Sequence, residues 1–194
     1  MKKILIVLDG ASDLPIGSFG GKTPFEMAET PNLDWFAKNG SLGYMYPIDD
    51  KTAPGSDNSL ISIFGNNPKL CKRGIYEAIG AGFKLKRGDL ALRTNFCTIG
   101  NFKTKKIKDR RVGRTLSNKE ARVLAKALNE KIKLSCDFEF KSTIQHRGVL
   151  VFRGGFSDNI SNTDPEWIPG DSNDFEFSKP LDEADENAKH TANI

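Results

Sequence analysis

The first 65 residues alternate between short apolar runs and helical patterns. Ile4–Leu8 is a continuous apolar run with the length of one buried strand in a parallel sheet. Thr30 and Pro31 predict the start of a helix that ends at Gly40, and Gly43–Ile48 favours a second strand. Apolar residues recur at helical spacing again in 60–64. This order of strand, helix, strand and helix predicts one half of a doubly wound α/β sheet.

The pattern changes after residue 74. Residues 90–99 indicate one strand, and Ser117 and Glu120 form a capping box that predicts a helix. Its expected apolar side consists of Ala121, Leu124, Ala127, Leu128 and Ile132. Residues 136–141 alternate as in a half-exposed antiparallel strand, with 149–152 as its expected neighbour. The order strand, helix, strand, strand predicts an α+β domain.

Three segments follow from these patterns. Residues 1–74 are the first part of an α/β domain, and residues 75–178 are an α+β domain inserted into it. Residues 180–194 carry acids at their beginning and lack an internal glycine or proline, which predicts the opening of a helix. We expect 179–194 to return the chain into the first domain.

Composition narrows the class of protein. The 194 residues are 38% hydrophobic and 28% charged with a mean hydropathy of −0.45, which permits a core. Every apolar run is far below the ~20 residues of a transmembrane helix, so we expect a cytoplasmic protein without a membrane partner. Three widely spaced cysteines predict free thiols. The net charge is +4, and the dense basic run at 103–114 indicates a solvated face or an anion-binding patch.

Two residues of the first segment, Ser56 and Asp9, are candidates for a catalytic or ligand-binding role. Ser56 falls at a predicted loop-to-helix junction, where free N–H groups and the helix dipole favour a phosphate ester. It can be a nucleophile or an ordinary N-cap. Asp9 follows the first predicted strand, at the end of a sheet where ligands bind in open α/β folds. Asp9-Gly10 is also a common turn.

Sequence motifs resemble those of a known family over nearly the whole chain. They are Asp9–Asp13, Lys22–Ala28, Thr30–Asp34, residues 53–65, Glu77–Gly82, Leu92–Phe96, Asp109–Arg114 and residues 157–165. In this order they resemble the archaeal-type cofactor-independent phosphoglycerate mutases, members of the alkaline phosphatase superfamily. The resemblance implies a glycolytic isomerase that interconverts 3-phosphoglycerate and 2-phosphoglycerate. It also implies that this chain is an N-terminal half, and that the sheet is part of an alkaline-phosphatase-like fold.

The resemblance implies a metal-assisted phosphoserine mechanism without bisphosphoglycerate. Ser56 would be the nucleophile and a metal ligand, and Asp9 a second ligand. Two divalent cations, Mn²⁺, Mg²⁺ or Zn²⁺, would activate the serine. The remaining ligands would come from the missing half, so we expect weak or no turnover from 194 residues alone. His146 and His190 remain unassigned, and Leu60 stands where the family commonly has histidine.

A small phosphorylated acid is the implied substrate. The resemblance places its binding residues in the family's motifs: Asp57, Arg93, Asn95, Asp109, Arg110, Arg114, Asp158 and Asp164. Guanidinium groups suit a phosphate and a carboxylate. Solvated surface is the alternative for Arg110 and Arg114. Asp109 can be a hydroxyl anchor or an ion-pair partner of Arg111, and Asp164 can simply begin a turn.

Three other functions are compatible with parts of this pattern. A metal-dependent phosphatase of the same superfamily would share the nucleophile, and the chain could also be an inactive fragment. A nucleic-acid-binding module would use the basic run, but only Phe96 and Phe102 lie near it and no RNA-binding signature accompanies it. We therefore expect no nucleic-acid partner. The sequence leaves the oligomeric state open.

Overall fold

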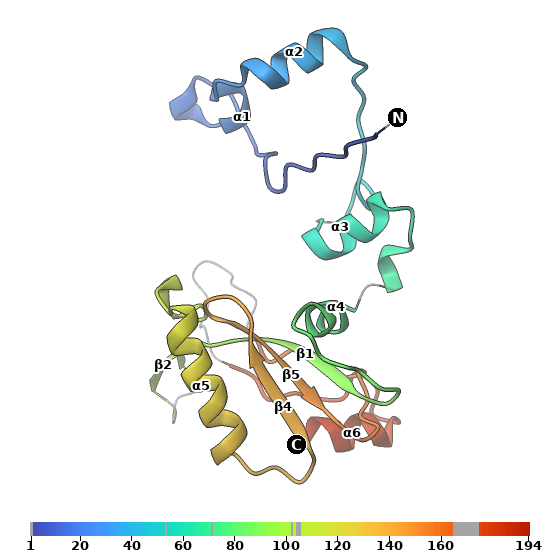
Figure 1. Cartoon of the computed structure of the whole chain (residues 1–194), viewed down its shortest axis with the longest axis vertical. Coiled ribbons are helices and arrows are strands. Elements are labelled where there is room, and N and C mark those ends of the chain that lie inside the picture. The colour runs from blue at the N-terminus through green and yellow to red at the C-terminus, as the bar shows by residue number, and fades with distance from the viewer. Residues whose placement is uncertain (1, 53, 71, 102, 104–105, 165–174) are drawn as a thin grey trace. The chain divides into compact units, whose positions relative to one another are not determined.

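The chain forms two compact units, residues 1–71 and 72–194 (Figure 1). The computed structural model describes residues 2–194 except 53, 71, 102, 104–105 and 165–174. Cys71, Phe102, Lys105 and Pro165, which entered the sequence-based expectations, lie outside the described residues.

Short helices dominate the first unit. They are η1 (Gly17–Phe19), α1 (Pro24–Met27), α2 (Pro31–Asn39), α3 (Ser56–Ile63) and η2 (Pro68–Leu70). A capping box between Thr23 and Glu26 begins α1. The predicted helix after Thr30 is confirmed, with Pro31 at its first position and Gly40 directly after its end. The predicted helix beginning near Ser56 is also confirmed.

Neither predicted strand of the first unit forms. Apart from one bridge between Ile16 and Lys22, no β pairing occurs among its described residues, and the doubly wound sheet is absent there. Figure 1 shows residues 2–8 as irregular chain. Ile4 is 86% exposed and Ile6 73% exposed. A strand needs a neighbouring strand to satisfy its backbone groups, and the described part of this unit supplies none.

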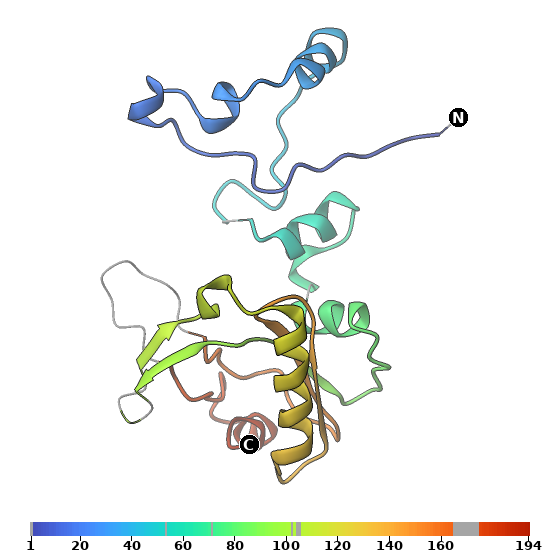
Figure 2. The same ribbon diagram turned by 60° about the vertical axis from the view of Figure 1, so that its left-hand side comes forward.

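Two sheets form the centre of the second unit. The larger has the order β1 (Leu90–Asn95), β5 (Arg147–Phe152) and β4 (Phe138–Ser142), and both pairings are antiparallel. The smaller pairs β2 (Thr98–Asn101) with β3 (Lys106–Asp109), and Figure 2 shows it as a separate hairpin. The predicted pairing of the last two strands is confirmed. The single strand predicted over 90–99 is wrong, because Phe96 and Cys97 interrupt it.

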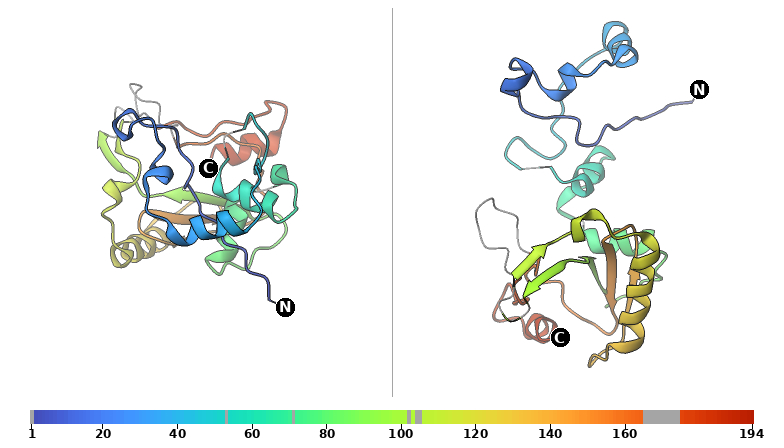
Figure 3. Two further views of the ribbon diagram at one scale, coloured as in Figure 1. Left: turned by 90° about the horizontal axis from the view of Figure 1, so that it is seen from above. Right: turned by 90° about the vertical axis from the view of Figure 1, so that its left-hand side faces the viewer.

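Helix α4 (Arg73–Gly80) packs on β1 and β5. Its Ala78 joins Phe83, Val149 and Val151 in a buried cluster. Val149 and Val151 are two residues apart on β5 and therefore share one face of the sheet. Figure 3 shows α4 and α5 (Asn118–Lys131) on one side of the sheet and α6 (Glu186–Ala192) on the other.

Helix α5 covers the free edge of β4. Its predicted capping box is confirmed, because the Ser117 hydroxyl accepts from the N–H of Glu120 and the Glu120 carboxylate accepts from the N–H of Ser117. The Asn129 amide bonds both the N–H and the carbonyl of Phe140, at 2.8 Å each, and so replaces a neighbouring strand.

Two helix details differ from the sequence-based expectation. The buried side of α5 is Ala121 and Ala125, whereas the expected Leu124 is 42% exposed, because the helix lies at a sheet edge and buries only small residues. The helix expected over 180–194 is shorter, since Asp185 caps it and α6 begins at Glu186.

Candidate active site

Asp9 and Ser56 meet in the first unit. The Ser56 hydroxyl donates to the Asp9 carboxylate, with Oγ 2.9 Å from Oδ2 and 3.1 Å from Oδ1. The two residues are 47 positions apart and both are exposed. Asp9 also lies in the expected turn, in which Gly10 has a φ of 68°. The geometry therefore places a carboxylate directly on a serine hydroxyl at a helix start.

The N-cap alternative for Ser56 is wrong. Ser56 is the first residue of α3, and Gly55 is the N-cap, with no side-chain cap hydrogen bond. A Cβ at position 55 would lie only 2.7 Å from the Asp57 carboxylate and 3.1 Å from the Asn58 amide oxygen. A larger residue at position 55 would therefore require the Asp57 and Asn58 side chains to move. Asp57 is half-buried in the first turn of the helix.

Asp9 and Ser56 could supply only some of the ligands that a divalent cation needs. Carboxylate and hydroxyl oxygens suit hard divalent cations, and Asp9 and Ser56 supply both kinds. The described part of the chain contains no group of three or more His, Cys, Asp or Glu side chains that could hold a metal ion. Two cations therefore need ligands beyond those of the described residues.

A cavity of about 650 Å³ in the second unit gathers four of the predicted substrate residues. Arg93, Asn95, Arg110 and Asp164 line it. Arg93 and Asn95 share a face of β1 because they are two residues apart. The Asn95 side-chain oxygen is buried and has no hydrogen-bond partner among the described residues, which leaves an acceptor for a ligand donor.

Arg110 and Asp164 form a two-pronged ion pair in this cavity. Arg110 Nε donates to one carboxylate oxygen at 3.0 Å, and Nη2 donates to the other at 2.5 Å. This parallel geometry fixes the guanidinium plane. Asp164 thus has a partner 54 residues away instead of only beginning a turn.

Two further arginines of the cavity lining, Arg73 and Arg93, both contact one carboxylate oxygen of Glu77. Arg73 Nε lies 2.8 Å and Arg93 Nε 3.0 Å from Glu77 Oε1. The two Nε atoms are thus within about 6 Å, where like charges repel by about 3 kcal/mol at an effective dielectric of 20, less where solvent screens them. Burial and then the charge of Arg73 lower the pKa of Arg93, and Glu77 opposes this shift.

The other predicted substrate residues lie elsewhere. Asp109 ends β3 and accepts from the backbone N–H of Arg111 at 2.7 Å, so its hydrogen bond is to the backbone of Arg111 instead of its side chain. Arg114 is exposed. Asp158 pairs with Lys72 at 3.0 Å and does not line the cavity.

Sequence reasoning left both histidines unassigned. His146 is 6% exposed, and its Nδ1 has no hydrogen-bond partner among the described residues. Burial, followed by the charges of Arg147 and three further arginines, lowers its pKa. His190 stacks on Phe156 with ring centroids 5.8 Å apart. Arg73 and Thr94, which also line the cavity, gave no sequence signal because their roles depend on contacts between distant segments.

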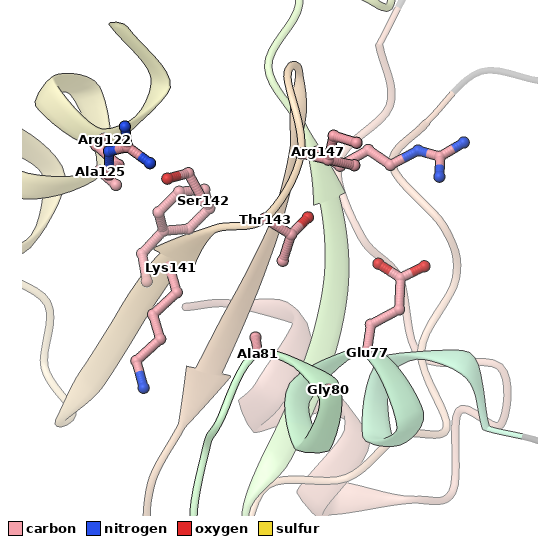
Figure 4. Close-up of a pocket in the computed structure, with 11 residues that line it drawn as sticks. Glu77, Gly80, Ala81, Arg122, Ala125, Lys141, Ser142, Thr143 and Arg147 are labelled. Atoms are coloured by element: carbon pink, nitrogen blue, oxygen red, sulfur yellow. The ribbon is translucent and has the colours of Figure 1, made fainter. Parts of the chain in front are cut away.

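A second cavity of about 710 Å³ opens between α4, α5 and the turn after β4 (Figure 4). Arg122, Ser142 and Thr143 contribute polar groups to it. Figure 4 shows the Glu77 carboxylate extending from α4 toward Arg147. No sequence-based expectation concerned this cavity, and Glu77 links its lining to that of the first through Arg73 and Arg93.

Comparisons with known proteins define the class. The model of the family described as 2,3-bisphosphoglycerate-independent phosphoglycerate mutase matches residues 37–194. The chain belongs to this family, as the motifs predicted. A mutase of that name from Thermococcus kodakarensis is 45% identical over 198 residues, which cover 100% of this chain and 45% of the relative. One from Pyrococcus furiosus is 47% identical over 79% of this chain and 37% of the relative.

Two solved structures are also similar to this chain, and one of them has a mutase title. The cofactor-independent phosphoglycerate mutase from Thermoplasma acidophilum has 36% identity and a TM-score of 0.51 over 96% of this chain and 49% of that one. The PH0037 protein from Pyrococcus horikoshii has 32% identity and a TM-score of 0.59 over 75% and 35%. The chain thus spans about half or less of the length of each of these four relatives. Among the described residues, no helix has the length and apolar character needed to span a bilayer.

Proposed function

We propose that this chain is the N-terminal part of an isomerase that interconverts 3-phosphoglycerate and 2-phosphoglycerate in glycolysis and gluconeogenesis. The reaction would pass through a phosphoserine on Ser56. The contact between Ser56 and Asp9 carries this proposal, because two residues 47 positions apart meet with the geometry of an activated nucleophile. Membership of the mutase family supports the reaction class.

Each residue of the pair has a distinct role in this proposal. The Asp9 carboxylate orients the Ser56 hydroxyl and favours loss of its proton. Ser56 takes the phosphoryl group from one hydroxyl of glycerate and returns it to the neighbouring one. Two divalent cations, such as Mn²⁺, Mg²⁺ or Zn²⁺, when bound supply further activation of the hydroxyl, with Asp9 and Ser56 among their ligands.

The cavity of the second unit would hold the anionic substrate. Arg93 and Arg110 suit its phosphate and carboxylate groups, Asp164 orients Arg110, and the buried oxygen of Asn95 can accept from a substrate hydroxyl. We assign Asp57, Asp109, Arg114 and Asp158 to substrate binding on the motifs alone. No bisphosphoglycerate would take part, as the family name implies.

The architecture that we propose has three parts. Residues 1–74 would begin an alkaline-phosphatase-like domain, 75–178 would be the inserted substrate domain, and 179–194 would lead back. Residues 3–8 and 43–48 would become strands of the wound sheet. The polypeptide that relatives have beyond the matched portion would supply their neighbours and the missing metal ligands, since the chain covers only 45% of the Thermococcus relative.

A chimera tests the proposal. This chain replaces the matching portion of the Thermococcus kodakarensis mutase, and the product is assayed for 2-phosphoglycerate, free phosphate and a phosphorylated protein. We expect mutase turnover and a phosphoserine. Ser56→Ala should lower turnover by about 10⁴-fold or more and abolish the phosphoprotein. Asp9→Asn, which keeps the shape and removes the charge, should lower it by about 10²-fold or more.

Ser62→Ala is the matched control, because Ser62 belongs to the same helix and has no role in the proposed site. It should retain turnover and phosphorylation. A phosphoprotein that survives Ser56→Ala would exclude Ser56 as the nucleophile. Mostly free phosphate from an otherwise active chimera would favour the metal-dependent phosphatase.

A further inference from the structure

We infer that Thr94 is a specificity-determining residue that, together with Asn95, makes the cavity of about 650 Å³ selective for hydroxy acids. In a complex with such an acid, the Asn95 side chain accepts from the ligand hydroxyl and the Thr94 hydroxyl donates to the ligand carboxylate. The inference rests on the proposed function only in naming a phosphoglycerate as that acid. No motif marked Thr94, which borders the cavity only through the fold.

Both side chains carry a buried polar atom without a partner. Neither Oγ1 of Thr94 nor Oδ1 of Asn95 has a hydrogen-bond partner among the described residues. Buried side-chain oxygens are mostly hydrogen-bonded in folded proteins, because an unpaired one loses its bonds to water without replacement. Two such atoms on consecutive residues that line one cavity indicate that a bound ligand completes their hydrogen bonds.

The cavity borders the free edge of β1. In the three-stranded sheet β1 is an edge strand, paired with β5 on one side only. The Phe96 N–H bonds the carbonyl of His146, which directly precedes β5. Backbone groups alternate along an antiparallel strand, so those of Arg93 and Asn95 face away from β5. Both residues line the cavity, and their N–H groups can therefore donate to a ligand at this edge.

The two side chains contact different groups of the ligand, because neighbouring residues of a strand project to opposite faces. Asn95 Oδ1 only accepts hydrogen bonds, and the hydroxyl is the donor of a phosphoglycerate whose carboxylate and phosphate are ionised. The Thr94 hydroxyl can donate, as the N–H groups at the free edge can, and these donors suit the carboxylate. A ligand that lacks the hydroxyl would leave Asn95 Oδ1 buried and unpaired, which costs affinity.

Calorimetry of the 194-residue chain with 3-phosphoglycerate and with 3-phosphooxypropanoate, which lacks the hydroxyl, tests the inference. We expect 3-phosphoglycerate to bind about tenfold more tightly or better, because the analogue leaves Asn95 unpaired. Asn95→Leu, which is similar in size but has no acceptor, should remove this preference. Thr94→Val, which keeps the shape, should weaken binding of both ligands by about tenfold and retain the preference.

NMR of the unmodified chain gives a measurement that needs no variant. The signals of the Thr94 methyl group and of the Asn95 side-chain amide should shift when 3-phosphoglycerate is added. Thr143→Val is the matched control for calorimetry, because Thr143 follows β4 and does not line this cavity. It should bind both ligands as the unmodified chain does.

Four results would each overturn the inference: equal affinity for the two ligands, binding of neither, unchanged binding in Thr94→Val, or NMR signals that do not shift. The chimera described above separates these results from failure of the proposed function. Turnover by the chimera, without a preference between the two ligands in the 194-residue chain, would reject the inference alone. A preference in the chain without turnover by the chimera would reject the proposed function alone.

Discussion

Asp109 stabilises a backbone conformation that L-residues rarely adopt. Val112, Gly113 and Arg114 follow one another with φ of 52°, 59° and 57°. Each non-glycine residue there costs roughly 1–2 kcal/mol, and valine is poorly suited to it because its Cβ is branched. The carboxylate of Asp109 accepts from the N–H of Arg111 at 2.7 Å and faces this turn. Such strain is typical of functional segments, and this one lies in a motif of the mutase family.

Asp109→Ala should therefore destabilise the turn in a pH-dependent way. The backbone N–H groups of Arg111 and Gly113 lower the pKa of Asp109. An aspartate with a lowered pKa contributes stability above its unfolded pKa of about 3.9 and loses it as the pH falls through the folded pKa. We expect the unfolding midpoint of the variant to be a few degrees lower than that of the unmodified chain at pH 7, and the difference to shrink as the pH falls below about 3.9.

An NMR titration of the Asp109 carboxyl carbon provides the direct measurement. A pKa at or above about 3.9 would contradict the prediction. Asp137, which is exposed and directly precedes β4, offers a control position at which alanine should have little effect at either pH.

At the scale of elements, α4 can pack closely against β1 only because Gly74 has no side chain. A Cβ at Gly74 would lie 1.9 Å from the carbonyl oxygen of Ala91 and 2.7 Å from its carbon. Both atoms belong to the backbone of a strand that is paired along its length with β5, so they cannot move aside. This contact sets where α4 places Arg73 and Glu77 relative to Arg93.

Gly74→Ala should consequently destabilise the second unit by about 3 kcal/mol and weaken phosphate binding. Gly80→Ala in the same helix is the control, because nothing lies within 4 Å of a Cβ there. Alanine at position 80 should stabilise the helix by about 0.5–1 kcal/mol. Urea unfolding followed through the methyl signals of Val149 and Val151 reports on this unit alone. Equal stability of the two variants would contradict the close-contact argument.

Local signals predicted the elements that local interactions form. The capping box of Ser117 and Glu120 identified α5, alternation identified β4, and the apolar run at 149–152 identified its neighbour β5. The break between β1 and β2 was missed, because β1 ends where its antiparallel partner β5 begins, at the pair of Asn95 and Arg147, and that pairing joins segments about 50 positions apart. The same limit applies to the candidate site: motifs predicted Asp9 and Ser56, whereas the contacts of Glu77 with Arg73 and Arg93 became visible only in the fold.

At the scale of the whole chain, the two units differ in how their apolar residues are used. The second unit buries Val149 and Val151 completely, whereas the first leaves Ile4, Ile6 and Tyr44 largely exposed to solvent. Ordering a six-residue strand costs about 6–12 kcal/mol, while burying five apolar side chains returns about 8–15 kcal/mol. A strand at 3–8 is favourable only when neighbours bury it.

Hydrogen exchange should report this difference directly. In the 194-residue chain, amides of β1, β4 and β5 should exchange slowly, because they are paired in a sheet, and amides of 3–8 and 43–48 should exchange fast. In the chimera with the remainder of the Thermococcus mutase, both segments should become protected by about 10²-fold or more, while the protection of β5 changes little. Mass spectrometry of peptides covering the three regions gives the measurement. Fast exchange of 3–8 in a chimera that turns over substrate would show that this segment is not a strand of the completed sheet, and that Asp9 reaches Ser56 without one.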